Sequence, residues 1–233
     1  MVSVADSVVV VTGGRRGLGA ALVDELLDRG VSKVYSTARQ SYSDPRSNVV
    51  THPLEVTDDA SVAEFVQRAG DAQILINNAG VAPAGSVLTG DFGDMVTAFD
   101  TNVFGPIRLT RAFAPVLSAN GGGAVVNMLS ILSWLAGAGA YGASKSALWS
   151  FTNSLRLELA PQGTQVLGVH ASFIDTEMAA AIPAAKSSPA VVAHRIIDAL
   201  EAGEAEVLTD ADTVQAKAAL TGPVERLTLD LGH

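Results

Sequence analysis

The sequence predicts an α/β protein built on a doubly wound parallel sheet, with helices covering both faces. Short runs of β-branched residues alternate along the chain with longer segments whose apolar residues recur at helical spacing. The valine run 8–11 is apolar throughout, which is typical of a strand buried on both faces of a parallel sheet. No repeat or low-complexity linker interrupts the alternation, so we expect a single domain over residues 1–233.

A glycine-rich turn follows this first strand. It reads Thr12-Gly-Gly-Arg-Arg-Gly-Leu-Gly19, and leucines then recur at helical spacing from 18 to 27 until Gly30 ends the helix. Glycines let the backbone approach a pyrophosphate closely, and a helix N-terminus offers unpaired N–H groups to its oxygens. We therefore predict a dinucleotide site here, with a plain turn as the alternative.

The end of the second strand, 33–38, bears on the choice of dinucleotide. A fold that binds NAD usually places an acidic residue about 20 residues after the glycines, on the ribose 2′-hydroxyl. Ala38 occupies that place, and Arg39 follows it. Arg39 with Arg15 or Arg16 can clamp a 2′-phosphate, which favours NADP(H) over NAD(H). Solvated surface charges are the alternative.

The middle of the chain continues the alternation. Residues 49–56 contain a third strand, and 57–59 read as the cap and acidic first turn of a helix that ends near residue 70. The fourth strand, 73–76, runs into Asn77-Asn-Ala-Gly80, whose small and amide-bearing residues suit a cofactor crevice. Asparagines that merely satisfy the loop are the alternative. The segment 92–117 is predicted to be largely helical.

The fifth strand, 124–129, delivers Ser130 at its carboxyl end, where catalytic groups are commonly sited. Tyr141 and Lys145 stand four apart at the start of a helix predicted over 141–159, so their side chains leave the same face one turn apart. An ammonium there can lower the phenol pKa from about 10 and suit it to general acid/base catalysis. A surface pair is the alternative.

The remaining elements complete the sheet. We predict a sixth strand over 164–170, a loop over 183–188, and a helix capped by Ser188 with Pro189 in its first turn. A last strand over 206–208 and a last helix over 211–220 follow.

Composition excludes several classes of function. The formal charge is -9 and the basic residues are scattered, so nucleic acid is not an expected partner. The absence of cysteine removes disulfides, thiolate nucleophiles and Cys-ligated zinc, and the four histidines have no metal-ligand spacing. The N-terminus has no signal-peptide pattern, and the charge-free region 112–144 is interrupted by proline, asparagine and glycine. We expect a cytoplasmic protein with no metal and no membrane span.

Taken in order, the motifs resemble those of the short-chain dehydrogenase/reductase family from Val8 to about Met178. The resemblance implies a Rossmann-like domain with a catalytic tetrad of Asn102, Ser130, Tyr141 and Lys145. The matching pieces are Thr12 to Gly19, Leu54-Glu-Val-Thr-Asp58, Asn77-Asn-Ala-Gly80, Asn102-Val-Phe-Gly105, Ser130, Tyr141-Gly-Ala-Ser-Lys145 and Ile174-Asp-Thr176.

The same resemblance implies a role for each tetrad member. Tyr141 exchanges a proton with the substrate oxygen, to which Ser130 also hydrogen-bonds, while nicotinamide carries the hydride. Lys145 holds the nicotinamide ribose and lowers the Tyr141 pKa, and Asn102 anchors a water that links the lysine to solvent. The expected cofactor contacts are Gly13, Arg15, Arg16, Gly17, Leu18, Gly19, Arg39, Glu55, Val56, Asn77, Asn78, Ala79, Gly80, Tyr141, Lys145, Ile174 and Thr176.

The expected activity is therefore NADP(H)-dependent interconversion of an aldehyde or ketone and an alcohol, as in a carbonyl reductase or alcohol dehydrogenase. The alternative is a protein that binds the dinucleotide as a structural or regulatory ligand without turnover. By the same resemblance we expect a homodimer or homotetramer that pairs through the helices after the fourth and fifth strands.

Several positions depart from the family pattern. The interval from Ser130 to Tyr141 is short, which leaves Ser133 as an alternative to Ser130. Glu55 stands where the family usually has aspartate, Ala171-Ser172 replaces Pro-Gly, and the tail 227–233 lacks the usual final glycine pair. The alanine-rich segment 179–188 predicts only a small lid over an open substrate site. Candidate pocket or packing residues are Trp134, Leu135 and Trp149.

Overall fold

Seven parallel strands form one sheet, in the order β3-β2-β1-β4-β5-β6-β7, in the computed structural model, which describes residues 2–229. The order reverses between β1 and β4, and ligands of doubly wound sheets bind at the carboxyl ends of the strands beside such a switch point. The predicted fold class is confirmed. The strands are β1 Val8–Val11, β2 Lys33–Ala38, β3 Val49–Pro53, β4 Ile74–Asn77, β5 Ala124–Met128, β6 Gln165–His170 and β7 Glu206–Leu208.

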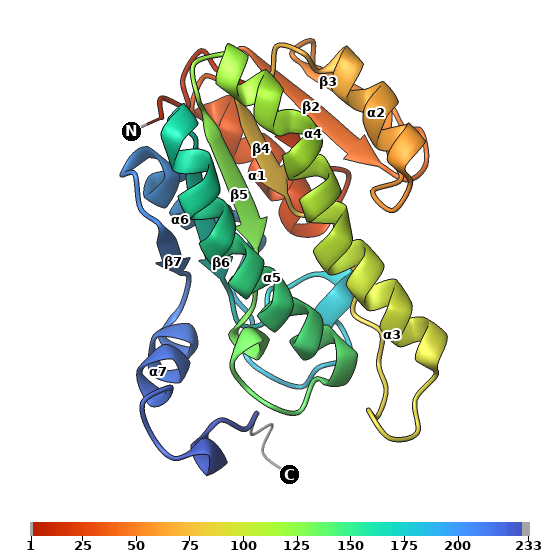
Figure 1. Ribbon diagram of the computed structural model, residues 1–233, viewed down its shortest axis with the longest axis vertical. Coiled ribbons are helices and arrows are strands. Elements are labelled where there is room, and N and C mark those ends of the chain that lie inside the picture. Colours follow the sequence, from red (N-terminus) through yellow and green to blue (C-terminus); the bar gives the residue numbers. More distant parts are fainter. Residues whose placement is uncertain (1, 230–233) are drawn as a thin grey trace.

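Helices cover both faces of the sheet (Figure 1). α1 (Gly17–Asp28) and α6 (Pro189–Glu201) pack together on one face. α2 (Asp59–Arg68), α4 (Gly105–Ala119) and α5 (Gly139–Leu159) lie on the other. α3 (Phe92–Phe99) and α7 (Ala211–Ala219) continue past the carboxyl ends of the strands, so the loops that carry the predicted site lie between them.

The burial of both sheet faces explains why the first strand is uniformly apolar. Successive side chains of β1 point in opposite directions, so alternate valines enter different layers. Val9 packs in the layer with Leu22 of α1, whereas Val10 packs in the layer that holds Phe65 and Phe113, from α2 and α4. An amphipathic strand would leave one of these layers unfilled.

The helix ends confirm some of the capping predictions and correct one. Asp58 caps α2, as predicted, by accepting a hydrogen bond from the Ser61 N–H at 2.6 Å. Ser188 occupies the N-cap position of α6 and Pro189 its first turn, as predicted, but the Ser188 side chain makes no capping hydrogen bond. Asp210 and Thr213 form a reciprocal capping box at the start of α7.

The segment 92–117 is not one continuous helix. A π-helical stretch, η1 (Asp100–Phe104), separates α3 from α4. Single π turns inside helices are frequent at functional sites. Asn102 lies in this stretch and is fully buried.

The chain after α7 returns to the loop between Ser130 and Tyr141. Ala136 N donates to Leu227 O at 2.8 Å, and Leu229 N donates to Ala136 O at 2.9 Å. Residues 230–233, which complete the tail noted above, lie outside the described residues. Within residues 2–229, no helix is long and apolar enough to cross a membrane, and no group of three or more metal-ligating side chains is found.

Candidate active site

The glycine turn after β1 is closed by its own backbone and by the loop after β4. Gly13 and Gly17 have φ angles of 67° and 56°, which favour glycine. A Cβ on Gly19 would lie 2.0 Å from the Gly13 carbonyl oxygen, so no larger residue fits. Thr12 Oγ1 accepts hydrogen bonds from the N–H groups of Asn78 and Ala79, both at 2.9 Å.

The start of α1 meets the requirements of a phosphate site. Its N-cap residue, Arg16, makes no side-chain capping hydrogen bond, so the first-turn N–H groups remain available to an anion. Leu18 is buried and anchors the turn in the core below. The residues present therefore fit the pyrophosphate of a dinucleotide.

The three predicted phosphate-binding arginines separate into two groups. Gly14 N donates to Thr37 O at 2.9 Å, which holds the glycine turn against the end of β2, where Arg39 is exposed. The Arg15 guanidinium lies 5.8 Å from the ring centroid of Tyr42, in the loop after β2. Arg16 points elsewhere and forms an exposed ion pair with Glu177. This geometry favours Arg15 over Arg16 as the partner of Arg39.

Tyr42 is not among the site residues predicted from the sequence. Its hydroxyl donates to Ser36 Oγ, which joins the loop to β2. An aromatic residue in a polar loop beside the arginines was the available signal.

The asparagines after β4 serve mainly to hold the backbone. Asn77 is 2% exposed, and its amide donates to Asn127 Oδ1 at 2.8 Å, inside the layer between the sheet and α5. Asn78 donates to Thr12 O at 2.8 Å. Both side chains thus follow the alternative reading, in which they satisfy the fold. Ala79 and Gly80 continue the loop at the carboxyl end of β4.

The other predicted cofactor contacts lie in the loops after β3 and β6. Glu55 accepts from the Thr57 hydroxyl at 2.9 Å, and Val56 is buried against Gly105. In the loop after β6, which also carries Ile174, Thr176 Cγ2 lies 3.2 Å from the position that a Cβ on Gly17 would take. Thr176 therefore borders the glycine turn.

Tyr141 and Lys145 share one face of α5, as their spacing predicts. The Lys145 Nζ atom lies 5.7 Å from the centroid of the Tyr141 ring and donates to the carbonyl of Met128 at 2.7 Å. Lys145 is buried, and burial lowers its pKa to about 8. Its ammonium still carries a proton at neutral pH and lies beside the phenol ring.

The expected lowering of the Tyr141 pKa is not found in this structure. Burial raises the pKa of Tyr141, because a phenolate loses more solvation than a phenol does, and the Ser130 hydroxyl opposes this rise only in part. The prediction from spacing considered the nearby charge and omitted the desolvation of the ring.

The two candidate serines have different environments. The Ser130 side chain lies close enough to Tyr141 to oppose the rise of its pKa, and its hydroxyl accepts from the Leu132 N–H at 3.1 Å. The Ser133 hydroxyl accepts from the Ser130 N–H at 3.3 Å, so it is directed at backbone. The structure therefore favours Ser130 as the serine that faces Tyr141.

Asn102 connects the loop after β4 with α5. Its side chain pairs with both backbone groups of Val81, each at 2.9 Å, and donates to Ser144 Oγ at 3.0 Å. Both hydrogens of its side-chain amide are therefore engaged at the base of the site. Ser144, one residue before Lys145, was missed because a small polar residue in a helix carries no distinctive signal.

The departures from the family pattern have local compensations. Ser172, in place of glycine, donates its N–H to Asp210 Oδ2 at 2.9 Å. The segment 179–188, which is predicted to be a small lid, is joined to the loop after β6 where Ser187 N donates to Phe173 O at 2.8 Å. Trp134 and Trp149 pack edge to face with centroids 5.9 Å apart, and Trp134 together with Leu135 also lines the larger hollow beside α5.

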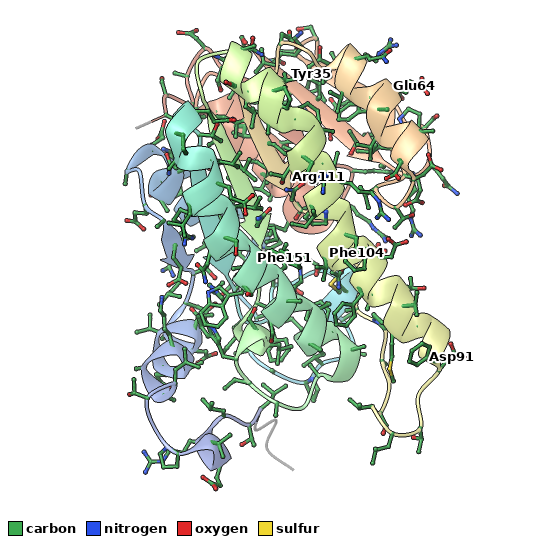
Figure 2. All side chains as sticks on the ribbon, viewed as in Figure 1. Tyr35, Glu64, Asp91, Phe104, Arg111 and Phe151 are labelled. Atoms are coloured by element: carbon green, nitrogen blue, oxygen red, sulfur yellow. The ribbon has the colours of Figure 1, made fainter. Side chains whose placement is uncertain are left out.

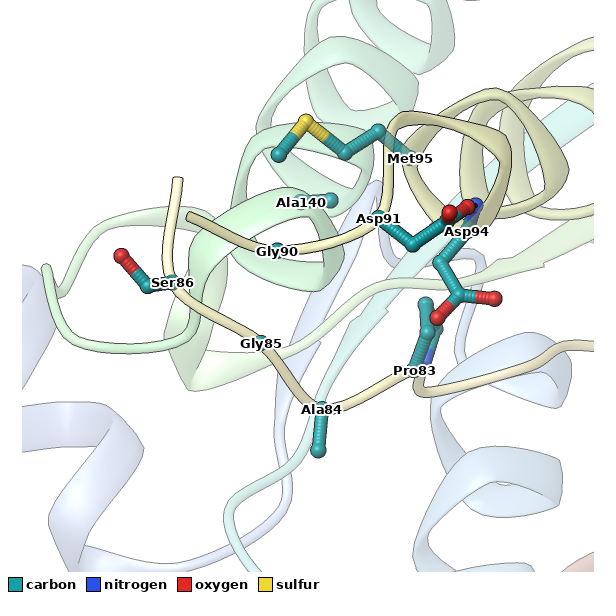
Figure 3. Close-up of a pocket in the computed structure, with 9 residues that line it drawn as sticks. All are labelled: Pro83, Ala84, Gly85, Ser86, Gly90, Asp91, Asp94, Met95 and Ala140. Atoms are coloured by element: carbon teal, nitrogen blue, oxygen red, sulfur yellow. Dashed lines mark hydrogen bonds between the residues drawn. The ribbon is translucent and has the colours of Figure 1, made fainter. Parts of the chain in front are cut away.

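Two hollows lie beside the start of α5. Figure 3 shows the smaller, about 10 Å³, between the loop and helix that follow β4 and Ala140. The larger, about 310 Å³, lies between the loop that carries Leu135, the first turns of α5 and the tail at Val224 and Leu227. The first is too small for a substrate, and the second opens along the tail.

Comparisons with known proteins bear on the family and the fold of this chain. Residues 7–187 match the family model described as short chain dehydrogenase. An NADPH-dependent 1-acyldihydroxyacetone phosphate reductase of Schizosaccharomyces pombe is 35% identical over 185 residues, which cover 75% of this chain and 62% of that protein. The short-chain dehydrogenase virD of Hypocrea virens is 33% identical over 72% of this chain and is likewise spanned over only 62% of its length.

Solved structures extend the similarity to nearly the whole chain. A short chain dehydrogenase from Burkholderia cenocepacia, in complex with NADP, is 36% identical with a TM-score of 0.92, and the match covers 97% of each chain. An NADPH-bound carbonyl reductase from chicken fatty liver is 26% identical with a TM-score of 0.78, over 84% of this chain and 91% of that one.

Proposed function

Because the chain belongs to the short-chain dehydrogenase/reductase family, we propose that it is an NADP(H)-dependent oxidoreductase that interconverts an aldehyde or ketone and an alcohol. The observation that carries the proposal is that Tyr141 and Lys145 lie together, with Ser130 directly after β5, at the edge of the sheet that also carries a glycine turn that fits a dinucleotide. The NADP-bound Burkholderia structure, at 36% identity, supports the choice of cofactor. NAD(H) is the second choice.

The proposed cofactor supplies or accepts the hydride, and the chain supplies orientation and a proton. N–H groups of the glycine turn bind the pyrophosphate, and Arg15 with Arg39 binds the 2′-phosphate. The Lys145 ammonium, which is held in place by its hydrogen bond to Met128 O, binds the nicotinamide ribose.

The Tyr141 hydroxyl performs the proton transfer. In the reductive direction it gives its proton to the substrate oxygen, while the Ser130 hydroxyl hydrogen-bonds the same oxygen. A raised phenol pKa keeps Tyr141 protonated at neutral pH, which suits a general acid. The adjacent Lys145 ammonium favours the phenolate that remains and returns a proton to it. The oxidative direction reverses these steps. Asn102 holds the backbone of this site and, by the family resemblance, anchors a water on the proton path.

A panel of aldehydes and ketones tests the proposal. Purified protein with NADPH is expected to consume at least one of them, followed by loss of NADPH absorbance and detection of the alcohol. NADPH that binds but is never oxidised with any carbonyl would favour the alternative of a regulatory or structural dinucleotide-binding protein.

The cofactor preference gives a second prediction. The intact protein is expected to bind NADPH at least tenfold more tightly than NADH, because charge-assisted hydrogen bonds contribute about 1.5–3 kcal/mol each. Arg39→Asp is expected to abolish or reverse that ratio, since it replaces attraction for the 2′-phosphate with repulsion. Titration calorimetry with both cofactors measures it.

Arg68→Asp is the matched control for this change. Arg68 is exposed at the end of α2, away from the proposed cofactor site and subunit interface, and the substitution alters the net charge equally. Its NADPH to NADH ratio should match that of the intact protein. A preference for NADH in the unmodified chain would contradict the proposed specificity.

The remaining parts of the proposal concern assembly and location. We propose pairing into a homodimer or homotetramer through α4 and α5. The exposed rings of Phe104, at the end of η1 just before α4, and of Phe151 on α5 support this (Figure 2). We also propose that residues 1–233 act as one domain, with 179–188 as a small lid over an open substrate site. A cytoplasmic location stays a prediction from the sequence.

A further inference from the structure

A buried histidine behind Ser130 has no part in the mechanism above. His170 ends β6, the strand beside β5, and its ring is fully buried. Trp134 stacks on that ring with centroids 3.9 Å apart, and Trp149 contacts it edge-on at 6.2 Å. These two aromatic contacts fix both the plane and the position of the imidazole.

The hydrogen bond of His170 determines which nitrogen carries its proton. Nδ1 lies 3.0 Å from the carbonyl oxygen of Ser130, and a carbonyl can only accept, so Nδ1 is the donor. Burial lowers the His170 pKa to about 4, so the ring is neutral at neutral pH and Nε2 has no proton.

Glu206 and Lys217 surround the other nitrogen. Nε2 lies 3.3 Å from Glu206 Oε1 without forming a hydrogen bond, and Glu206 pairs with Lys217. Because the unprotonated Nε2 and the carboxylate oxygen are both acceptors, no hydrogen bond can form between them. Among residues 2–229, the Nδ1 bond is therefore the only hydrogen bond of the His170 ring.

The Ser130 carbonyl, which accepts this bond, lies in a segment whose backbone is hydrogen-bonded on both sides of the serine. The N–H groups of the neighbouring residues Leu129 and Ile131 donate at 2.8 Å to Val169 O in β6 and to Ala171 O just after it. The Ser130 carbonyl accepts from both the Ser133 N–H and His170 Nδ1, each at 3.0 Å. Two donors from different directions restrict rotation of the peptide that follows the serine, and hence the direction of its side chain.

We propose that His170 is a positioning residue, whose Nδ1–H holds the Ser130 carbonyl so that the serine hydroxyl stays directed at Tyr141. The inference rests on the proposed function for its kinetic consequence. Its structural consequence, a fixed Ser130 to Tyr141 contact, is independent of turnover.

Two substitutions separate the hydrogen bond from the packing. His170→Phe keeps an aromatic ring to stack on Trp134 but removes the donor. His170→Asn loses the ring but places an amide N–H near the position of Nδ1. With the carbonyl substrate identified by the panel, His170→Phe is expected to lose about tenfold or more in kcat with an unchanged Kd for NADPH. His170→Asn is expected to recover most of that loss, although it packs less well.

A readout without cofactor or substrate accompanies the kinetics. The chain has three tyrosines, so the ¹³Cζ resonance of Tyr141 can be assigned by its disappearance in Tyr141→Phe. His170→Phe should move this resonance in the same direction as Ser130→Ala does, and His170→Asn should leave it close to that of the intact protein.

The outcomes distinguish the two proposals. An unchanged kcat and resonance in His170→Phe would overturn the positioning role. Equal losses of kcat in His170→Phe and His170→Asn, in proportion to the fall of their thermal midpoints, would also overturn it, because such losses would come from packing alone. If the intact protein reduces no carbonyl, the proposed function fails, and the resonance of Tyr141 still decides the role of His170.

Discussion

Tyr141→Phe is expected to lower kcat by about 100- to 10,000-fold, the usual contribution of a positioned general acid. The phenylalanine ring fills the space of the half-buried tyrosine on α5, so packing and the Kd for NADPH should change little. What disappears is the hydroxyl that exchanges a proton with the substrate oxygen. Steady-state kinetics with the carbonyl from the panel, together with calorimetric NADPH binding, measures the two effects separately.

Tyr35→Phe is the matched control, because it removes the same atom far from the site. The Tyr35 hydroxyl donates to Asp71 Oδ1 at 3.0 Å, near the end of α2. The same hydroxyl accepts from Lys33 Nζ at 3.1 Å, so this variant should keep full turnover and lose about 1–3 kcal/mol of stability, the usual value of two such hydrogen bonds. Equal loss of binding and turnover in Tyr141→Phe would count against its role as the acid.

Gly19→Ala is expected to abolish dinucleotide binding and to destabilise the fold. The added Cβ would lie 2.0 Å from the Gly13 carbonyl oxygen and 2.7 Å from Asn78 Nδ2, so the turn must move away from α1. Overpacking of this kind costs about 1–3 kcal/mol, occasionally more. The thermal midpoint and the NADPH titration should both show the change.

Gly70→Ala provides the comparison for this variant. A Cβ there would meet only Gln67 O, at 3.8 Å, and the residue does not have a positive φ angle. It should bind NADPH normally and keep its stability within about 0.5 kcal/mol of the intact protein. Normal NADPH affinity in Gly19→Ala would show that the glycine turn is not the binding site.

Local patterns in the sequence were sufficient for most of the framework. The second strand was predicted at 33–38 and spans Lys33–Ala38, because a strand edge depends on a nearby change of composition. The face shared by Tyr141 and Lys145 follows from helical geometry alone. The glycine turn was predictable because its residues and the helix after it are contiguous in the chain.

Other features depend on contacts between residues far apart in the sequence. Asn102 was placed inside a long helix, but the structure has a π-helical stretch there and binds its amide to Val81. Asn77 faces the layer under α5 because Asn127, from the next strand, accepts its amide hydrogen bond. Neither partner can be identified from spacing, since each comes from another element.

The sequence by itself thus determined the α/β alternation, the glycine turn and the alignment of Tyr141 with Lys145, because these depend on residues within one or two turns of the chain. Only the tertiary structure decided that Arg15 lies beside Tyr42 while Arg16 pairs with Glu177. It also decided that the Tyr141 pKa rises and that His170 holds Ser130. Burial and the pairing of charges arise when the layers assemble, and no local spacing specifies them.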